Sequence, residues 1–182
     1  MVISFTGAQS TGKSTLLKAI TVNESFKSFK FIPEVTRLVK KKYKLDINEK
    51  GDGMTQLAIL NAHLENYLQN RDCDVVMDRC ILYVLVYTTY QYHTGKVDPE
   101  TMLYCEYLFK KLISKVDIIF YTEPDIPLVD DGERSNDTTF RETIINLFET
   151  AIEHYGINVI RLKGTVEERL KVIYNTIDNY GK

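Results

Sequence analysis

The sequence predicts an α/β protein in which a five-stranded parallel sheet is covered by helices on both faces, in a three-layer α/β/α arrangement. Five short apolar segments occur along the chain, and segments with helical spacing of apolar residues separate them. Such alternation is typical of parallel sheets, because each crossover places a helix on one face. A chain of 182 residues with 44% hydrophobic residues is of a size to form one core. We therefore expect a single domain over residues 1–182.

The first two strand–helix units lie in the first quarter of the chain. Residues 2–7 (VISFTG) read as an apolar strand that ends in glycine, and residues 13–20 (KSTLLKAI) continue at helical period. Residues 29–33 (FKFIP) predict a second strand, stopped by its proline, and residues 34–44 (EVTRLVKKKYK) predict the helix that follows.

The middle of the chain predicts one strand and three helices. Residues 54–68 form a helix by their apolar spacing, and residues 74–78 (DVVMD) form the third strand. Two helices follow, over residues 81–95 and 99–115, divided by a turn that contains glycine and proline. The residues expected on the buried face of the helix over residues 54–68 are Leu57, Leu60, Leu64, Tyr67 and Leu68.

The last third of the chain supplies two more strands. Residues 116–122 (VDIIFYT) predict the fourth strand, and the polar, turn-rich residues 122–139 follow as a long loop. Residues 141–156 then predict a helix that ends at a glycine. Residues 157–162 (INVIRL) predict the fifth strand, and residues 166–177 predict the last helix.

A phosphate-binding motif connects the first strand to the first helix. Residues 7–14 (GAQSTGKS) match G-x-x-x-x-G-K-[ST] in the strand–loop–helix context that the motif requires. We call this segment the phosphate loop. Its glycines allow backbone N–H groups to point at phosphate oxygens, Lys13 can reach the β- and γ-phosphates, and the Ser14 hydroxyl can bind Mg²⁺. We expect ATP to contact Gly7, Ala8, Gln9, Ser10, Thr11, Gly12, Lys13, Ser14 and Thr15.

Charged residues follow the second and third predicted strands. Asp78 ends the third strand, where its carboxylate would hold Mg²⁺ together with Ser14, and Arg79 would bind oxygens of the acceptor. Asp78 and Arg79 could instead form a local surface ion pair. Glu34 precedes Arg37 by three residues, which places both on one helix face. Glu34 could act as a general base, or it could simply complement the helix dipole.

Several classes of protein fit the sequence poorly. The chain is short for a ring-forming motor, and the N-K-x-D motif of GTPases does not occur in it. A net charge of −2 disfavours a general nucleic-acid partner, although a local basic groove stays compatible with it. No apolar run approaches about 18 residues, and the layout of a signal peptide is missing. We expect a cytoplasmic protein without membrane contacts, as a monomer or homodimer.

Three segments give the chain a family resemblance. Residues 32–39 (IPEVTRLV), residues 55–96 and residues 116–135 (VDIIFYTEPDIPLVDDGERS) resemble, in order and spacing, the ribosylnicotinamide kinase domain of the NadR family. That domain is one of the P-loop nucleoside and nucleotide kinases. The resemblance implies ATP on the phosphate loop, an acceptor pocket built by the helices after strands two and three, and a mobile lid within residues 122–139. The family's least common element is Asp130-Asp131-Gly132-Glu133-Arg134.

Two departures from the family pattern fall near the expected acceptor site. The third strand ends in Asp78-Arg79-Cys80, closer to thymidylate and deoxynucleoside kinases than to the Asp-x-Asp of the family. An aromatic residue before the aspartate pair is replaced by Leu128-Val129. The acceptor therefore stays open between nicotinamide riboside, a deoxynucleoside and a deoxynucleotide. Since related single-domain proteins occur in phages, a hydroxymethylated base in DNA is a further alternative, and the cytoplasm is that of a bacterium or a phage-infected host.

Taken together, these patterns predict a Mg²⁺-dependent phosphotransferase that moves the γ-phosphoryl group of ATP to a small nucleoside or nucleotide. The alternative is a regulatory NTP-binding module. Asp130 and Asp131 would bind ribose hydroxyls, hold Mg²⁺ through water or pin Arg134, or they form a purely structural acidic turn. Arg141 would assist the lid, and Gln56 either reaches the acceptor or is a surface amide. The expected catalytic residues are Lys13, Asp78, Arg134 and Glu34, and the expected acceptor ligands are Glu34, Arg37, Arg79, Asp130 and Asp131.

Overall fold

The computed structural model describes residues 1–126 and 137–180. Its single five-stranded sheet is parallel throughout, with strand order β2-β3-β1-β4-β5. The predicted α/β fold with a five-stranded parallel sheet is confirmed. The strands are β1 (Val2–Thr6), β2 (Lys30–Ile32), β3 (Val75–Asp78), β4 (Ile118–Thr122) and β5 (Ile160–Leu162).

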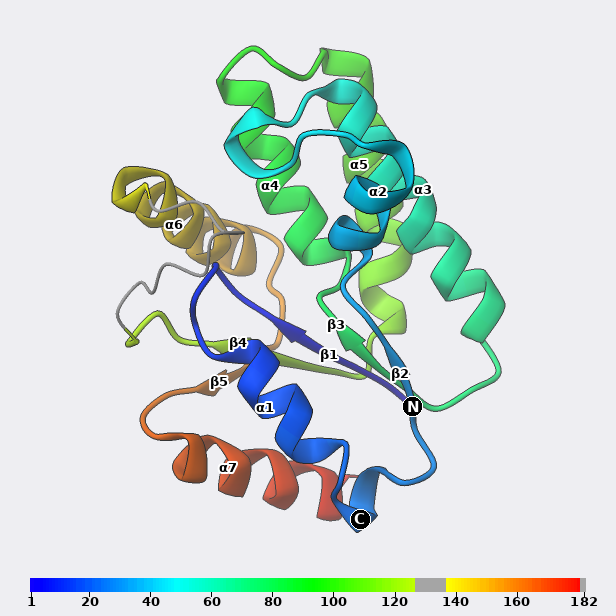
Figure 1. Cartoon of the computed structure of the whole chain (residues 1–182), viewed down its shortest axis with the longest axis vertical. Helices are drawn as coiled ribbons and strands as arrows, with labels where there is room; N and C mark the ends of the chain where they lie inside the picture. Colours follow the sequence, from blue (N-terminus) through cyan, green and yellow to red (C-terminus); the bar gives the residue numbers. More distant parts are fainter. Residues whose placement is uncertain (127–136, 181–182) are drawn as a thin grey trace.

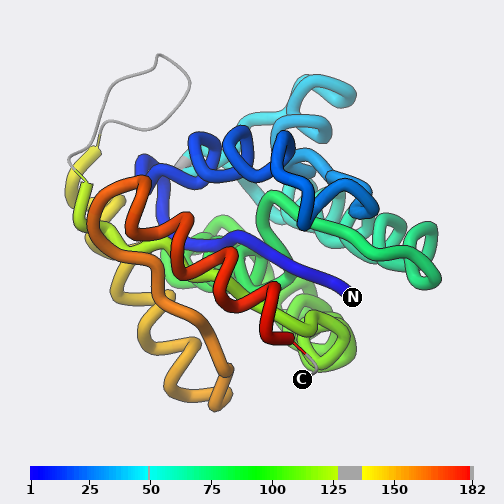
Figure 2. Tube along the Cα trace, turned by 90° about the horizontal axis from the view of Figure 1, so that it is seen from below, coloured from blue at the N-terminus to red at the C-terminus, as the bar shows by residue number. Residues whose placement is uncertain are grey.

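Helices cover both faces of this sheet, which confirms the three-layer arrangement (Figure 1). Two of them, α1 and α7, lie side by side on one face (Figure 2). The other five lie on the opposite face, where α4 packs against α3, α5 and α6. The helices are α1 (Lys13–Ile20), α2 (Val35–Tyr43), α3 (Gly53–Asn70), α4 (Ile81–His93), α5 (Pro99–Leu112), α6 (Thr138–His154) and α7 (Val166–Asp178).

Each face of the sheet has its own hydrophobic core. Phe5 and Phe120 stack on the face covered by α1 and α7, together with Leu16 of α1 and Ile173 of α7. On the other face, the first half of α4 is apolar all round and completely buried. A helix without a polar stripe needs neighbours on every side, and α3, α5, α6 and the sheet supply them. Burying each large apolar side chain contributes about 1.5–3 kcal/mol.

The register of the sheet brings the ends of β1 and β3 together. Phe5 of β1 pairs with Asp78 of β3, and Thr6 pairs with Tyr121 of β4. The phosphate loop leaves β1 directly after Thr6, so it starts beside the carboxyl ends of both neighbouring strands. This edge is where parallel α/β sheets bind their ligands.

Two sequence predictions need correction. Residues 122–139 are not all loop, because Thr122 belongs to β4 and α6 begins at Thr138. The buried face of α3 is also rotated from the predicted one. Leu60 is fully buried as predicted, and Leu64 and Tyr67 pack against the core, but Leu68 is 53% exposed, and the polar side chains of Gln56 and His63 are buried. The apolar spacing was wrong only in part, because Leu57 faces a groove shared with α2, while Gln56 on the side toward α4 bonds to Thr88.

No helix in the described ranges is both long enough and apolar enough to cross a membrane.

Candidate active site

The phosphate loop folds through three residues with left-handed backbone. The φ angles are +134° at Gly7, +55° at Ser10 and +84° at Gly12. Left-handed residues of this kind direct successive N–H groups into one concavity, which suits an anion. Gly7 is also needed for space, since a Cβ atom there would lie 2.7 Å from Oγ1 of Thr122. The loop therefore has the backbone form that its motif predicts.

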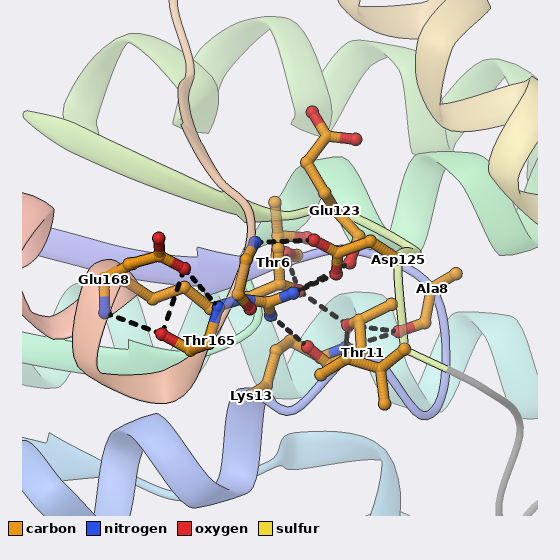
Figure 3. A network of polar contacts seen from close by, with 12 residues as sticks. Thr6, Ala8, Thr11, Lys13, Glu123, Asp125, Thr165 and Glu168 are labelled. Atoms are coloured by element: carbon orange, nitrogen blue, oxygen red, sulfur yellow. Dashed lines mark hydrogen bonds and ion pairs between the residues drawn. The ribbon is translucent and has the colours of Figure 1, made fainter.

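Hydrogen bonds inside the phosphate loop hold Lys13 in place. Its Nζ donates to the carbonyl oxygens of Gly7 at 3.0 Å and Ala8 at 2.5 Å, and to Oγ1 of Thr11 at 3.1 Å. Oγ1 of Thr11 also lies 2.6 Å from Oγ1 of Thr122 at the end of β4. Figure 3 shows Lys13 and Thr11 in this network. The ammonium group is thus buried against the loop from which it would reach phosphates.

One pocket brings the phosphate loop together with the residues predicted from β2 and β3. Glu34 enters it from the start of α2, and Asp78 and Arg79 enter it from the end of β3. These three segments are far apart in the sequence, yet their chemistry meets at one edge of the sheet. The lining residues are Gln9, Ser10, Thr11, Gly12, Lys13, Ser14, Thr15, Glu34, Asp78 and Arg79.

The Glu34 carboxylate lies between two arginines. Its Oε1 is 2.9 Å from Nη1 of Arg79, and its Oε2 is 3.0 Å from Nε of Arg37. The Arg79 guanidinium is largely buried and lies 3.9 Å over the ring of Tyr83. Arg37 is half-exposed. Glu34 therefore serves as more than a helix-start acid, and Arg79 pairs with Glu34 in the pocket rather than at the surface.

Arg79 has a strained backbone. Its φ angle is +75°, a left-handed value that residues other than glycine rarely adopt. Its N–H donates to the carbonyl oxygen of Phe5 at 2.9 Å, which continues the β1–β3 pairing by one residue. Strain of this kind persists where the surrounding structure imposes it, and it concentrates at functional sites. The turn carries the chain from β3 into the buried start of α4.

Burial dominates the electrostatics of Asp78. It raises the pKa of the Asp78 carboxyl above its ordinary value, although the charges of Arg79 and Lys13 act in the opposite direction. The carboxylate form is therefore costly in this pocket without a further cation. A bound cation would repay that cost.

The donor set of the pocket fits a magnesium ion. Ser14 offers a hydroxyl and Asp78 a carboxylate to the same space, and oxygen ligands of this kind suit Mg²⁺. Within the described ranges, no group of three or more His, Cys, Asp or Glu side chains is placed to hold a metal. An ion held by one carboxylate, one hydroxyl and the phosphates of a nucleotide matches what the pocket provides.

Arg169, in the first turn of α7, is a site residue that sequence reasoning missed. Its side chain is 1% exposed and donates through Nη1 to the carbonyl oxygen of Thr11 at 2.7 Å and through Nε to that of Gly164 at 3.0 Å. It also pairs with Asp125, which follows β4. A signal was present, because the T-x-x-E capping box at Thr165 predicts a helix start beside the carboxyl end of β5.

Two other predicted residues have defined places. Arg141 of α6 donates to the carbonyl oxygen of Ile126 at 2.8 Å and to that of Gln9 at 3.4 Å. It thus contacts both the phosphate loop and a described residue within the predicted lid. Gln56 is buried, and its Oε1 accepts from Oγ1 of Thr88 at 3.1 Å, so it is not a surface amide. Asp130, Asp131 and Arg134 lie outside the described residues.

The family model described as AAA domain matches residues 2–169 of the chain. No curated protein sequence matches this chain. The solved structure of deoxyadenosine kinase from M. mycoides with dCMP and dCDP superposes with a TM-score of 0.73 and 16% identity, over 98% of this chain and 99% of that chain. NadR protein in complex with NR gives a TM-score of 0.71 and 16% identity, over 96% of this chain and 50% of that chain.

A second NadR structure, in complex with NAD and AMP-PNP, gives a TM-score of 0.70 and 17% identity. It covers all of this chain, which spans half the length of the NadR chain. At identities this low, the superpositions establish the fold alone, which is that of the P-loop nucleoside kinases. The resemblance to the NadR kinase domain, predicted from the sequence, is confirmed at that level.

Proposed function

We propose that this chain, which belongs to the AAA domain family, is a Mg²⁺-dependent kinase that transfers the γ-phosphoryl group of ATP to a nucleoside. One observation carries the proposal. Lys13, Glu34, Asp78 and Arg79 come from three distant segments and line a single pocket with the phosphate loop. Phosphoryl transfer needs positioning and charge neutralisation more than covalent chemistry, and this pocket supplies both.

Residues of the phosphate loop bind the donor. The backbone N–H groups of the loop and the dipole of α1 attract the phosphates of ATP. Lys13 exchanges its bonds to the carbonyl oxygens of Gly7 and Ala8 for phosphate oxygens. Ser14 and Asp78 hold Mg²⁺, which, when bound, neutralises charge on the β- and γ-phosphates. Arg141 stands beside the loop at Gln9, where it supports the lid.

Glu34 favours a hydroxyl over a phosphate as the acceptor. A phosphate acceptor needs cations and no general base, whereas the pocket presents a carboxylate to the acceptor side. The arginines beside it are already bonded to that carboxylate, at 2.9 Å and 3.0 Å. They hold it in one orientation, from which it takes the proton of the attacking hydroxyl. Arg37 and Arg79 thus orient the base and contact the acceptor from the same side.

The lid and the identity of the nucleoside complete the proposal. Arg134 stabilises the transferred group from the lid, and Asp130 and Asp131 bind ribose hydroxyls or restrain that arginine. Both nicotinamide riboside and deoxynucleosides suit the pocket chemistry. The M. mycoides deoxyadenosine kinase and the NR-bound NadR protein motivate these two acceptors.

A transfer assay tests the proposal. The protein is incubated with Mg²⁺ and γ-³²P-labelled ATP, and with ribonucleosides, deoxynucleosides, nicotinamide riboside, nucleoside monophosphates or duplex DNA. We expect label in a free nucleoside, and loss of transfer with EDTA. Lys13→Met should abolish transfer, whereas Lys18→Met, on the exposed side of the same helix, should not. Transfer to DNA alone, or to none of these acceptors, would refute a nucleoside kinase.

A further inference from the structure

A continuous series of side-chain contacts joins Arg79 to Gln9 behind the pocket. The Arg79 guanidinium lies 3.9 Å over the Tyr83 ring, and the rings of Tyr83 and Tyr87 lie 4.1 Å apart at 30°. The Tyr87 hydroxyl then donates to Oε1 of Gln9 at 3.1 Å. Both ends of this series line the pocket, while the two tyrosines are buried in the core behind it. The wall of the pocket is therefore braced from Arg79 to the phosphate loop.

Each end of the series carries a buried donor without a partner. Nε2 of Gln9 and Nε of Arg79 are both inaccessible to solvent and make no hydrogen bond to any described residue. Gln9 is only 6% exposed. A buried donor without a partner costs about 1–3 kcal/mol, so proteins retain few of them. Two in the wall of one pocket indicate a ligand that satisfies them.

The Tyr87 hydroxyl determines what Gln9 can offer to a ligand. The oxygen of Gln9 accepts from Tyr87, and the two N–H donors of its amide nitrogen are still without a partner. The atom of Gln9 that a ligand would satisfy is therefore the donor Nε2. Nε of Arg79 is likewise a donor and never an acceptor. The ligand group that meets both must therefore be a hydrogen-bond acceptor, such as an oxygen.

We propose that the side-chain amide of Gln9 and Nε of Arg79 bind an oxygen of the nucleoside acceptor beside the transferred phosphoryl group, with Tyr87 as the positioning residue for Gln9. Backbone N–H groups and Lys13 serve the donor phosphates, whereas Gln9 and Arg79 line the same pocket as Glu34, the proposed general base for the acceptor, and Asp78. The two carboxylates disfavour a second anion there and favour a neutral hydroxyl oxygen. This inference rests on the proposed function.

Tyrosine hydroxyl deletions provide the first test. Tyr87→Phe removes the bond that orients Gln9. Tyr104→Phe removes a tyrosine-to-amide bond of the same type and length, 3.1 Å to Asn61, at the surface. With the nucleoside that the wild-type protein phosphorylates best, Tyr87→Phe should raise the acceptor KM roughly threefold to tenfold. The KM for ATP should match that of Tyr104→Phe, whereas the Tm should fall further because Oε1 of Gln9 loses its buried donor.

A second variant tests the amide itself. Gln9→Met has a side chain of similar length, removes the donor nitrogen and adds no charge beside the phosphate loop. It should raise the acceptor KM by about tenfold or more with a much smaller change in the KM for ATP. If both variants leave the acceptor KM at the Tyr104→Phe value, or raise both KM values equally, the inference is wrong while the kinase stands. If the wild-type protein phosphorylates no acceptor, both the proposed function and this inference are wrong.

Discussion

Nη1 of Arg169 donates to the carbonyl oxygen of Thr11 at 2.7 Å, across 158 residues of sequence. The same guanidinium bonds to the carbonyl oxygen of Gly164 and to Asp125, whose carboxylate also accepts from the N–H of Gly164. Figure 3 shows Thr11, Asp125 and Thr165 around this point. A single buried side chain thus joins the phosphate loop to the segments that follow β4 and β5. The shape of the loop depends on a residue far outside the motif.

Replacing Arg169 should destabilise the fold. Arg169→Met keeps an apolar stem but leaves the carbonyl oxygens of Thr11 and Gly164 without their donor, at a cost of roughly 2–4 kcal/mol in the free energy of unfolding. Arg161→Met is the control, because its pairs with Glu123 and Glu149 are half-exposed and should contribute less than about 1 kcal/mol. Urea unfolding measures both. Equal losses would show that Arg169 is no more important than a surface arginine.

The fold could be predicted almost completely from the sequence, because the elements of a parallel sheet are short and strongly marked. The motif fixed where α1 begins at Lys13, and apolar runs located all five strands within a few residues. The rotation of α3 could not be predicted. Its buried side carries Gln56 and His63, whose burial depends on partners such as Thr88 that only the tertiary structure supplies.

The candidate site could likewise be predicted only in part from the sequence. Lys13 and Glu34 follow strands and Asp78 ends one, and parallel strands end at one edge, so their meeting in a pocket could be expected from order alone. Arg169 and the contact between Gln9 and Tyr87 depend on which side chain a helix turns toward the loop. After a strand as short as β5, the sequence does not determine how the following helix is rotated about its axis.

Glu34→Gln should lower kcat for a hydroxyl acceptor by about 10²–10⁴-fold, because the amide cannot take a proton. The KM for ATP should change little, since the donor is bound by the phosphate loop. Glu65→Gln, an exposed carboxylate on α3, is the matched control and should retain full activity. Initial rates at saturating ATP measure the effect. If Glu34→Gln keeps its kcat with every accepted nucleoside, Glu34 is not the base.

Asp78→Asn should raise the stability of the protein while lowering its activity. Burial raises the pKa of Asp78, so the ionised carboxylate costs the folded state stability at neutral pH, and this cost vanishes as the pH falls below the ordinary value of 3.8. The variant should therefore have a higher Tm than the wild type at pH 7 without Mg²⁺, and the gain should shrink in acid. Its kcat with Mg²⁺-ATP should fall by about 10²-fold or more. A lower Tm at pH 7 would contradict the sign of the shift.

His63 should make the protein sensitive to acid. Burial, together with the charge of Arg79, lowers its pKa from 6.5 to about 4. The unfolded chain then binds a proton between these values that the folded protein does not, so stability is complete above pH 6.5 and falls as the pH drops toward 4. The difference amounts to about 3 kcal/mol. His63→Leu should flatten the dependence of the free energy of unfolding on pH across this window. The control His93→Leu, at an exposed position on α4, should keep the wild-type dependence, and identical pH curves for both variants would exclude His63 as the cause.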